Sequence, residues 1–515
     1  MRKLLPILCL LACFAFKKNV FGQSSFAVKD PVDLTSNAND YKKNIEVYTE
    51  ALKNKSQAKS EVARLHFLRG MNEHALNEYD KAISDYTVTI SLSPLYSDAY
   101  SYQADDYKLT KNYQLAINDY KKLVLLIKDD SARSAFTYNN MAFVQRQLGQ
   151  YKNAIQSCSQ AIAMDSNYGA AYANRAELYN LTGQFQLPVN DFSTAMRGYQ
   201  SNSRLLSVLF SERADSRRML KQYIDAINDY SYAIGLNPGN KISYWNRAAT
   251  YDLNSDYQLA DEDYSRAIIF YKGDNISLSR LYSDRAQMEI RLHQSKKAIE
   301  NDAISILLDN KFADAYLCMA EAYAQNGDHQ LSINYYNKAI RLVRNNRHVL
   351  SIIYNGLARE AYFLNNYQKV IVASTLAIKM DATAWGPYLN RGKAYLKQMN
   401  KKLAIRDFNK VLAMDTAKQS FEYAFALFYT GQPDKAINVM QNKLLLTTDS
   451  AVLIGCYYNL ACLFSLMNKP EEANIYLKKC IEAGYAKRYV LADANLENIN
   501  STQVFQDIIS NDLTK

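Results

Sequence analysis

The sequence predicts an all-α protein built as a solenoid of stacked helix pairs. Similar blocks recur along the chain, such as YANRAELY at 172–179, YWNRAATY at 244–251 and YLNRGKAY at 388–395. Apolar residues within each block are spaced three or four apart, which is the period of a helix. The 515 residues include 41 Tyr but only 16 Gly and 8 Pro, so residues that form turns are scarce.

A helix-pair repeat of about 34 residues accounts for these blocks, with the first aromatic residue placed at position 4. Twelve repeats then start at 63, 97, 135, 169, 207, 241, 279, 313, 351, 385, 417 and 454. Position 8 is Gly or Ala in all twelve repeats, position 20 is Ala in nine, and position 4 is aromatic in ten. Small residues at positions 8 and 20 allow the two helices of a repeat to pack closely.

The spacing of the repeats alternates up to residue 418, as from 63 to 97 and then from 97 to 135, so the true period is a doublet of 72. Every second interval is longer, and the extra segments are 131–134, 203–206, 275–278 and 347–350. Each extra segment adds about one helical turn, and Ser and Asn at or before these segments are good helix N-caps. We therefore expect a longer first helix in every second repeat.

This pattern closely resembles the tetratricopeptide repeat family over about residues 40–482. The resemblance implies antiparallel helix pairs stacked into a right-handed superhelix, in which each repeat buries its apolar face only against its neighbours. We expect the array at 63–482, a degenerate half-repeat that caps it at 40–58, and a C-terminal cap at 483–515. The resemblance also implies a protein-binding scaffold and not an enzyme.

The N-terminal segment has the pattern of a signal peptide. Arg2 and Lys3 precede an apolar run at 4–16, which is too short to span a bilayer. Cleavage after Gly22 would leave 1–22 as the signal and 23–39 as a linker. The alternative is an envelope lipoprotein with an assembly role, acylated at Cys13, which follows Leu-Leu-Ala. Both alternatives predict an exported protein, periplasmic or on the cell surface.

The sequence shows no catalytic, metal or cofactor motif. Its five histidines are scattered, without the paired spacing of a metalloprotease helix. The five cysteines after the signal segment include no C-x-x-C pair. The net charge is +10, but the charges are interspersed, whereas nucleic-acid binding favours a basic stripe. A protein or peptide is therefore the expected partner, the membrane is reached only through a lipid anchor, and the oligomeric state stays open.

Asparagine recurs at position 6, where the resemblance implies a concave binding face. The candidates for peptide binding are Asn140, Asn174, Asn246, Asn390 and Asn459. An Asn amide can both donate to and accept from an extended peptide backbone. The alternative is that Asn is only the common residue at this position. Basic residues late in the array, Arg359, Lys393 and Lys397, could orient a charged partner, or could be ordinary surface charge.

Arginine at position 7 accompanies aspartate at position 23. Both occur in the repeats that start at 63, 169, 207, 241 and 385. Two repeats break the correlation, with Gln103 opposite Asp119 and Arg285 opposite Asn301. We predict an ion pair inside each repeat, since an arginine fork can hold a carboxylate through two hydrogen bonds.

Overall fold

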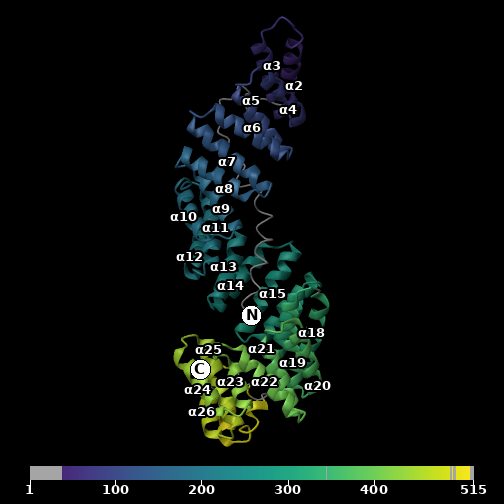
Figure 1. The fold of residues 1–515 in the computed structure, drawn as a ribbon, viewed down its shortest axis with the longest axis vertical. Coiled ribbons are helices and arrows are strands. Elements are labelled where there is room, and N and C mark those ends of the chain that lie inside the picture. The colour runs from purple at the N-terminus through teal and green to yellow at the C-terminus, as the bar shows by residue number, and fades with distance from the viewer. Residues whose placement is uncertain (1–37, 344, 486, 488–489, 491–493, 511–515) are drawn as a thin grey trace. The chain divides into compact units, whose positions relative to one another are not determined.

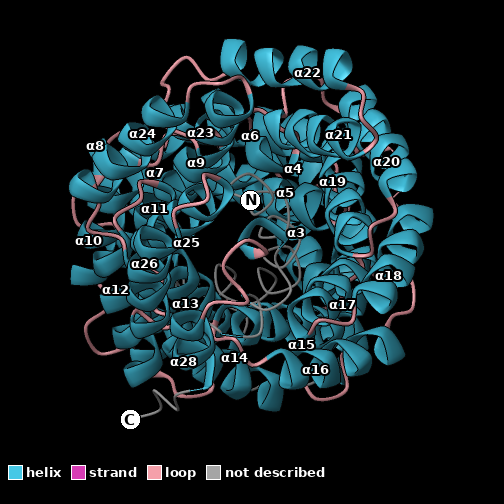
Figure 2. Ribbon diagram, turned by 90° about the horizontal axis from the view of Figure 1, so that it is seen from below, coloured by secondary structure: helices cyan, strands magenta, loops and turns pink. Residues whose placement is uncertain are grey.

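A computed structural model describes residues 38–343, 345–485, 487, 490 and 494–510. The expected signal peptide, the linker up to residue 37 and Cys13 lie outside these residues. Every regular element in the described ranges is helical (Figure 2), which confirms the predicted all-α solenoid of helix pairs. None of these helices is both long and apolar enough to cross a membrane.

The helices follow one another in pairs along the chain (Figure 1). The first helices of the twelve pairs are α3 (Lys59–Ala75), α5 (Ser97–Leu109), α7 (Ser131–Gln147), α9 (Gly169–Leu181), α11 (Ser203–Met219), α13 (Lys241–Leu253), α15 (Asn275–Arg291), α17 (Ala313–Asn326), α19 (Arg347–Phe363), α21 (Trp385–Lys397), α23 (Phe421–Tyr429) and α25 (Ser450–Leu466). The second helices are α4 (Tyr79–Leu92), α6 (Tyr113–Leu126), α8 (Tyr151–Met164), α10 (Gln186–Arg197), α12 (Tyr223–Leu236), α14 (Tyr257–Phe270), α16 (Ser295–Leu308), α18 (His329–Leu342), α20 (Tyr367–Met380), α22 (Lys401–Met414), α24 (Pro433–Leu446) and α26 (Pro470–Glu482). Helix α2 (Ala38–Ala51) precedes these pairs, and η1 (Ala494–Leu496) and α28 (Gln503–Ser510) follow them.

The chain divides into two compact parts, here called the N-terminal half, up to Asn254, and the C-terminal half, from Ser255 onward. Within each half, successive first helices contact one another, as α7 contacts α9 and α19 contacts α21. No two successive second helices in the described residues contact each other as extensively. The first helices therefore form the more closely packed side of each half, which we call the first-helix face.

The small residue at position 8 makes room for the ring at position 24. A Cβ atom on Gly70 would lie 2.7 Å from the Tyr86 ring, and one on Gly392 would lie 2.5 Å from the Phe408 ring. Both distances are shorter than van der Waals contact, so these two repeats need Gly where most others have Ala. Tyr86 and Phe408 are fully buried. Close packing at this position joins the two helices of each repeat.

The predicted lengthening of alternate first helices is confirmed. Helices α7, α11, α15 and α19 have 17 residues, whereas α5, α9 and α13 have 13. Each of the four long helices begins at the first extra residue, because the preceding side chain accepts the backbone N–H three residues further on. These capping residues are Asp130, Asn202, Asp274 and Asn346, at 3.0 to 3.1 Å.

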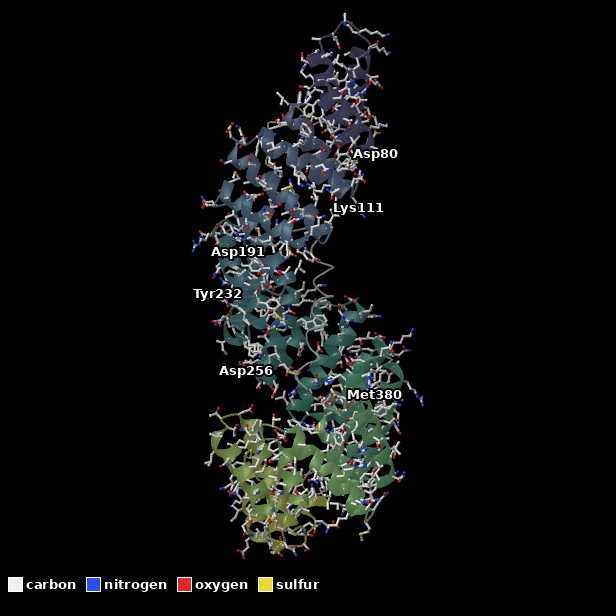
Figure 3. The ribbon with its side chains drawn as sticks, viewed as in Figure 1. Asp80, Lys111, Asp191, Tyr232, Asp256 and Met380 are labelled. Carbon is white, nitrogen blue, oxygen red and sulfur yellow. The ribbon has the colours of Figure 1, made fainter. Side chains whose placement is uncertain are left out.

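The turn inside every repeat uses one left-handed residue, at position 15. Four of these residues are glycines: Gly149, Gly183, Gly327 and Gly431. In the other eight repeats a residue with a side chain adopts positive φ: Asn77, Lys111, Lys221, Ser255, His293, Asn365, Met399 and Asn468. Lys111 is labelled in Figure 3, between α5 and α6. The conformation is thus a property of the repeat and not of glycine.

The regular spacing ends at α23, which has only nine residues. The carboxylate of Asp415 accepts backbone N–H groups of Lys418 at 2.9 Å and Ser420 at 2.8 Å. Ser420 in turn caps α23, because its hydroxyl accepts the N–H of Tyr423 at 2.9 Å. This hydrogen-bonded loop takes the place of the first turn that other first helices have, and it follows the shorter spacing between the repeats at 385 and 417.

The C-terminal end is covered by the residues after α26. Phe505 and Ile508 of α28 are buried in one apolar cluster with Leu477, Leu496 and Ile499. An array end otherwise exposes the apolar face that a further repeat would cover. Helix α28 therefore serves as a cap for the final repeat.

Candidate functional site

Four of the five predicted arginine–aspartate pairs are present. They are Arg69–Asp85, Arg175–Asp191, Arg213–Asp229 and Arg391–Asp407, and in each pair Nε and Nη2 donate to the two carboxylate oxygens at 2.6 to 2.9 Å. Asp191, labelled in Figure 3, belongs to α10. The aspartate side chains are at most 10% exposed. Arg247 and Asp263 lie on opposite sides of the division of the chain, so that pair stays a prediction.

Each of these arginines also reaches the preceding repeat, which the sequence analysis missed. Nη1 donates to a hydroxyl at position 25 of that repeat, and Arg247 makes the same contact. The five bonds are Arg69–Thr49, Arg175–Ser159, Arg213–Ser193, Arg247–Ser231 and Arg391–Thr375, at 2.8 to 3.2 Å. The position-7 arginines are therefore structural and are not available to a ligand.

The two exceptions show what replaces the ion pair. Gln103 donates to Thr87 Oγ1 at 2.7 Å and does not reach Asp119. Asp119 Oδ2 has no hydrogen-bond partner, and burial raises the pKa of this carboxyl to about 7. Arg285 Nε instead donates to Asp261 at 2.8 Å, while Asn301 donates to Glu289 at 2.7 and 2.9 Å.

The candidate asparagines at position 6 do not share one environment. Asn174 Nδ2 donates to Asn139 Oδ1 at 2.8 Å, and Asn390 Nδ2 donates to Asn355 Oδ1 at 3.0 Å. Two others use the amide inside the chain: Asn246 donates to Asp215 at 3.1 Å, and Asn459 donates to the carbonyl of Gly455 at 2.7 Å. Asn140 is half-buried and has no hydrogen bond in the described residues.

Two asparagine pairs therefore stand out: the N-terminal pair Asn139–Asn174, between α7 and α9, and the C-terminal pair Asn355–Asn390, between α19 and α21. In each pair the bond uses one N–H of the position-6 amide and the oxygen of its partner. The oxygen of the position-6 residue and the amino group of its partner bond to no described residue. Each half-buried pair thus offers one acceptor and one donor, which is what a peptide backbone requires.

Position 5, which supplies Asn139 and Asn355, was not recognised from the sequence. The signal is present, because Asn355 and Asn390 lie three doublets after Asn139 and Asn174, respectively. In the intervening doublets position 5 is Ser211 or Ser283. A search in the doublet register for asparagine at both positions would have found the two pairs.

A small cavity lies beside the N-terminal pair. It has a volume of about 10 Å³ and is lined by Ala142, Phe143, Arg146, Asn174 and Leu178. This is enough space for about one water molecule. Phe143 is 38% exposed, and Arg146 forms a two-bond ion pair with Glu177 at 2.9 and 3.0 Å. The partly exposed Phe143 ring and the internally paired Arg146 therefore adjoin the pair.

The acidic residues on the first-helix face of the N-terminal half are largely neutralised within the chain. Lys108 bonds to Asp105 at 2.7 Å, and Arg133 of α7 bonds to Asp98 of α5 at 2.7 Å. Asp215 accepts from the Tyr230 hydroxyl as well as from Asn246. Asp98, Asp105 and Asp215 are thus engaged in contacts inside the chain.

The five cysteines in the described residues are buried: Cys158, Cys318, Cys456, Cys462 and Cys480. Burial raises the pKa of the Cys158 thiol to about 12, and a protonated thiol is a poor nucleophile and metal ligand. No group of three or more His, Cys, Asp or Glu in the described ranges could hold a metal ion.

Three segments of the chain match the family model of the tetratricopeptide repeat, at residues 137–168, 313–346 and 454–483. They coincide with the repeats that start at 135, 313 and 454. The chain is a tetratricopeptide repeat protein.

Curated relatives share the repeats over part of their length. The DnaJ homolog subfamily C member 7 homolog of Dictyostelium discoideum is 21% identical over 249 residues, which is 46% of each chain. DnaJ homolog subfamily C member 7 of Mus musculus is 33% identical over 81 residues, 16% of each chain. The chain spans less than half the length of the first curated relatives it matches.

Among solved structures, a tetratricopeptide repeat protein from Parabacteroides merdae is 20% identical, with a TM-score of 0.42. The match covers 51% of this chain and 98% of that one.

Proposed function

We propose that this tetratricopeptide repeat protein is a scaffold that holds extended segments of a protein partner on its first-helix face. The observation that carries the proposal is the pair of unused polar groups at each asparagine pair. These amide groups are only partly buried, so a bound peptide backbone can reach them and take the place of water. The position-7 arginines, by contrast, are fully used inside the chain.

Backbone recognition needs few specific side chains, because every peptide presents the same N–H and C=O groups. The asparagine pairs would fix the direction and register of an extended segment. Surrounding side chains would then select its sequence. This division of roles is the one that strand-like peptide recognition uses elsewhere, where backbone bonds give affinity and side-chain contacts give specificity.

The test replaces both asparagine pairs with alanine in the full chain, at Asn139, Asn174, Asn355 and Asn390. We expect binding to a displayed library of random eight-residue peptides to fall about tenfold or more, since each pair loses two hydrogen bonds to the peptide. The matched control is Asn153→Ala with Asn334→Ala, two exposed asparagines on α8 and α18. Unchanged binding would show that the pairs are only structural. A loss of binding that a lower melting temperature fully accounts for would show the same.

For the location, we propose export to the periplasm or the cell surface, supported by the basic start and apolar run at 1–16. The alternative is an envelope lipoprotein with an assembly role, acylated at Cys13. Mass spectrometry of the mature N-terminus distinguishes them: an end at Gln23 supports cleavage alone, and a diacyl or triacyl Cys13 supports the lipoprotein. An intact Met1 in protein recovered from cells would contradict both.

A further inference from the structure

The two asparagine pairs occupy the same place in the doublet but have different neighbours. Three residues on the helix faces around them correspond across the three doublets that separate the pairs. Beside the N-terminal pair they are Phe143, Glu177 and Leu181, and beside the C-terminal pair they are Arg359, Lys393 and Lys397. The backbone-binding groups are thus shared, whereas the side chains that would contact a bound segment differ in chemical character.

The surroundings of the N-terminal pair include apolar side chains and no excess of positive charge. Phe143 and Leu181 are each 38% exposed. Glu177 is 5% exposed and is held by Arg146 through two hydrogen bonds. Glu212 of α11 also interacts electrostatically with Arg146, so an acidic ligand would find no unpaired cation among these residues.

The surroundings of the C-terminal pair are cationic. The Arg359 side chain is 54% exposed, and its Nε donates to Glu360 at 2.9 Å. Its two terminal nitrogens bond to no acceptor in the described residues. Lys397 is exposed and forms no ion pair there, and the Lys393 ammonium lies over the rings of Phe425 and Tyr429, at 4.8 and 5.9 Å from their centroids.

Two carboxylates offset part of this charge. Glu360 is 1% exposed and is held by both His329, at 2.8 Å, and Arg359, so it is occupied inside the chain. Glu321 of α17 also lies near Arg359. Lys397 has no carboxylate partner in the described residues, and the terminal nitrogens of Arg359 have the geometry that holds a carboxylate through two bonds.

We propose that the two asparagine pairs select different segments of a protein partner: the C-terminal pair an extended acidic segment, and the N-terminal pair an extended segment with an apolar side chain. This inference rests on the proposed function, since it assumes that both pairs bind a peptide backbone. The acidic segment is the better supported of the two, because it places a carboxylate beside Lys397 and the two terminal nitrogens of Arg359, which bond to no acceptor in the described residues.

The experiment is a selection from the random eight-residue library on the full chain and on two exchange variants. The first variant, Arg359→Phe with Lys397→Leu, gives the C-terminal pair the neighbours of the N-terminal one. The second, Phe143→Arg with Leu181→Lys, does the reverse. The matched control is Lys401→Phe with Lys402→Leu, which exchanges two exposed lysines of α22. Because added apolar residues could disturb folding, Arg359→Gln with Lys397→Gln is tested in parallel.

We expect the unmodified chain to enrich both acidic and apolar peptides. Enriched acidic peptides should bind about five-fold more weakly to the first variant and to the glutamine variant, from the loss of two partly exposed charge contacts. Their binding should weaken as salt rises, whereas that of apolar peptides should not. The second variant should bind acidic peptides more tightly, and the control should match the unmodified chain.

The possible failures are distinguishable. Absence of acidic peptides from the selection, or acidic binding that persists in both variants at Arg359 and Lys397, would overturn the inference about charge. The proposed function would survive that result if Asn355→Ala with Asn390→Ala still weakened the enriched peptides. If those alanines had no effect on any enriched peptide, the proposed function would itself be wrong.

Discussion

The two halves of the molecule join their repeats in different ways. In the N-terminal half, position 7 is Arg or Gln in five of the six repeats, and each of these side chains bonds to a hydroxyl in the preceding repeat. In the C-terminal half Arg391 does so and Arg285 bonds to Asp261 of the preceding repeat, whereas Met319, Leu357 and Leu460 are apolar. The contact between the position-7 side chain and the preceding repeat can therefore be polar or apolar.

The two halves differ in the free-energy cost of disturbing the contact between position 7 and the preceding repeat. A shifted apolar contact loses part of its burial, whereas a shifted Arg175 leaves Asp191 buried without the two hydrogen bonds that it accepts, at a cost of several kcal/mol. The polar contacts of the position-7 arginines in the N-terminal half thus strongly favour one alignment of each repeat against the preceding repeat. We expect the differences below, from the largest effect to the smallest.

Breaking a polar junction should have the largest effect. Arg391→Met leaves Asp407, which is 2% exposed, without its two charge-assisted bonds. We expect the local free energy of unfolding of α21 and α22 to fall by about 3 kcal/mol, measured by native-state hydrogen exchange. Arg406→Met is the control, since Arg406 is 66% exposed and 4.0 Å from Asp407, and it should cost less than about 0.5 kcal/mol. Equal costs would contradict the assignment.

Placing a cation opposite Asp119, the partly buried carboxylate that lies opposite Gln103 in its repeat, should stabilise the chain. Gln103→Arg should keep the bond to Thr87 and add a fork to Asp119, raising the free energy of unfolding by about 1–2 kcal/mol at pH 8. Burial raises the pKa of Asp119 to about 7 in the folded chain. In the unmodified chain the stability from its neutral form is complete below the unfolded pKa, near 4, and is lost as pH rises to 7.

The gain from Gln103→Arg should therefore be large at pH 8 and shrink toward pH 4.5, which urea unfolding followed by circular dichroism can measure. Gln103→Met serves as the control, because it removes the Thr87 bond and supplies no cation. A gain of the same size at both pH values would show that Asp119 is not the cause.

The smallest effect concerns the left-handed turn residues. Met399 is 92% exposed with φ of 60°, and Lys221 is also exposed with φ of 63°. Replacing either with Gly should stabilise its repeat by about 0.5–1 kcal/mol, since a side chain is disfavoured in this conformation. Gly327→Ala should destabilise by a similar amount, although its Cβ would meet no other atom within 4 Å. Thermal unfolding of the three variants would check the opposite signs.

The repeat frame, the longer alternate helices and four ion pairs could be predicted from the sequence because each depends on spacing within one or two repeats. The contacts between repeats could not be predicted from position 7 alone. Their signal was a second correlation: Ser or Thr at position 25 precedes every repeat with Arg or Gln at position 7. This correlation links two successive repeats, so a comparison of positions 7 and 23 within one repeat does not reveal it.

The binding candidates were predicted less well, and for a physical reason. An asparagine amide can bond to whatever lies nearest, so Asn246 turns to Asp215 and Asn459 to its own helix, although both have the same repeat position as Asn174. The environment of a position-6 residue is set by positions 5 and 9 of the preceding repeat. Sequence analysis at position 6 alone could not separate these cases.

The doublet has a consequence for how this chain could have changed in length. Loss or duplication of a whole doublet would keep long and short first helices in alternation and would leave intact any asparagine pair outside that doublet. Loss of a single repeat would put two long or two short helices side by side and would separate position 5 from its partner at position 6. The unit in which this array can change length without disturbing its packing is therefore the pair of repeats.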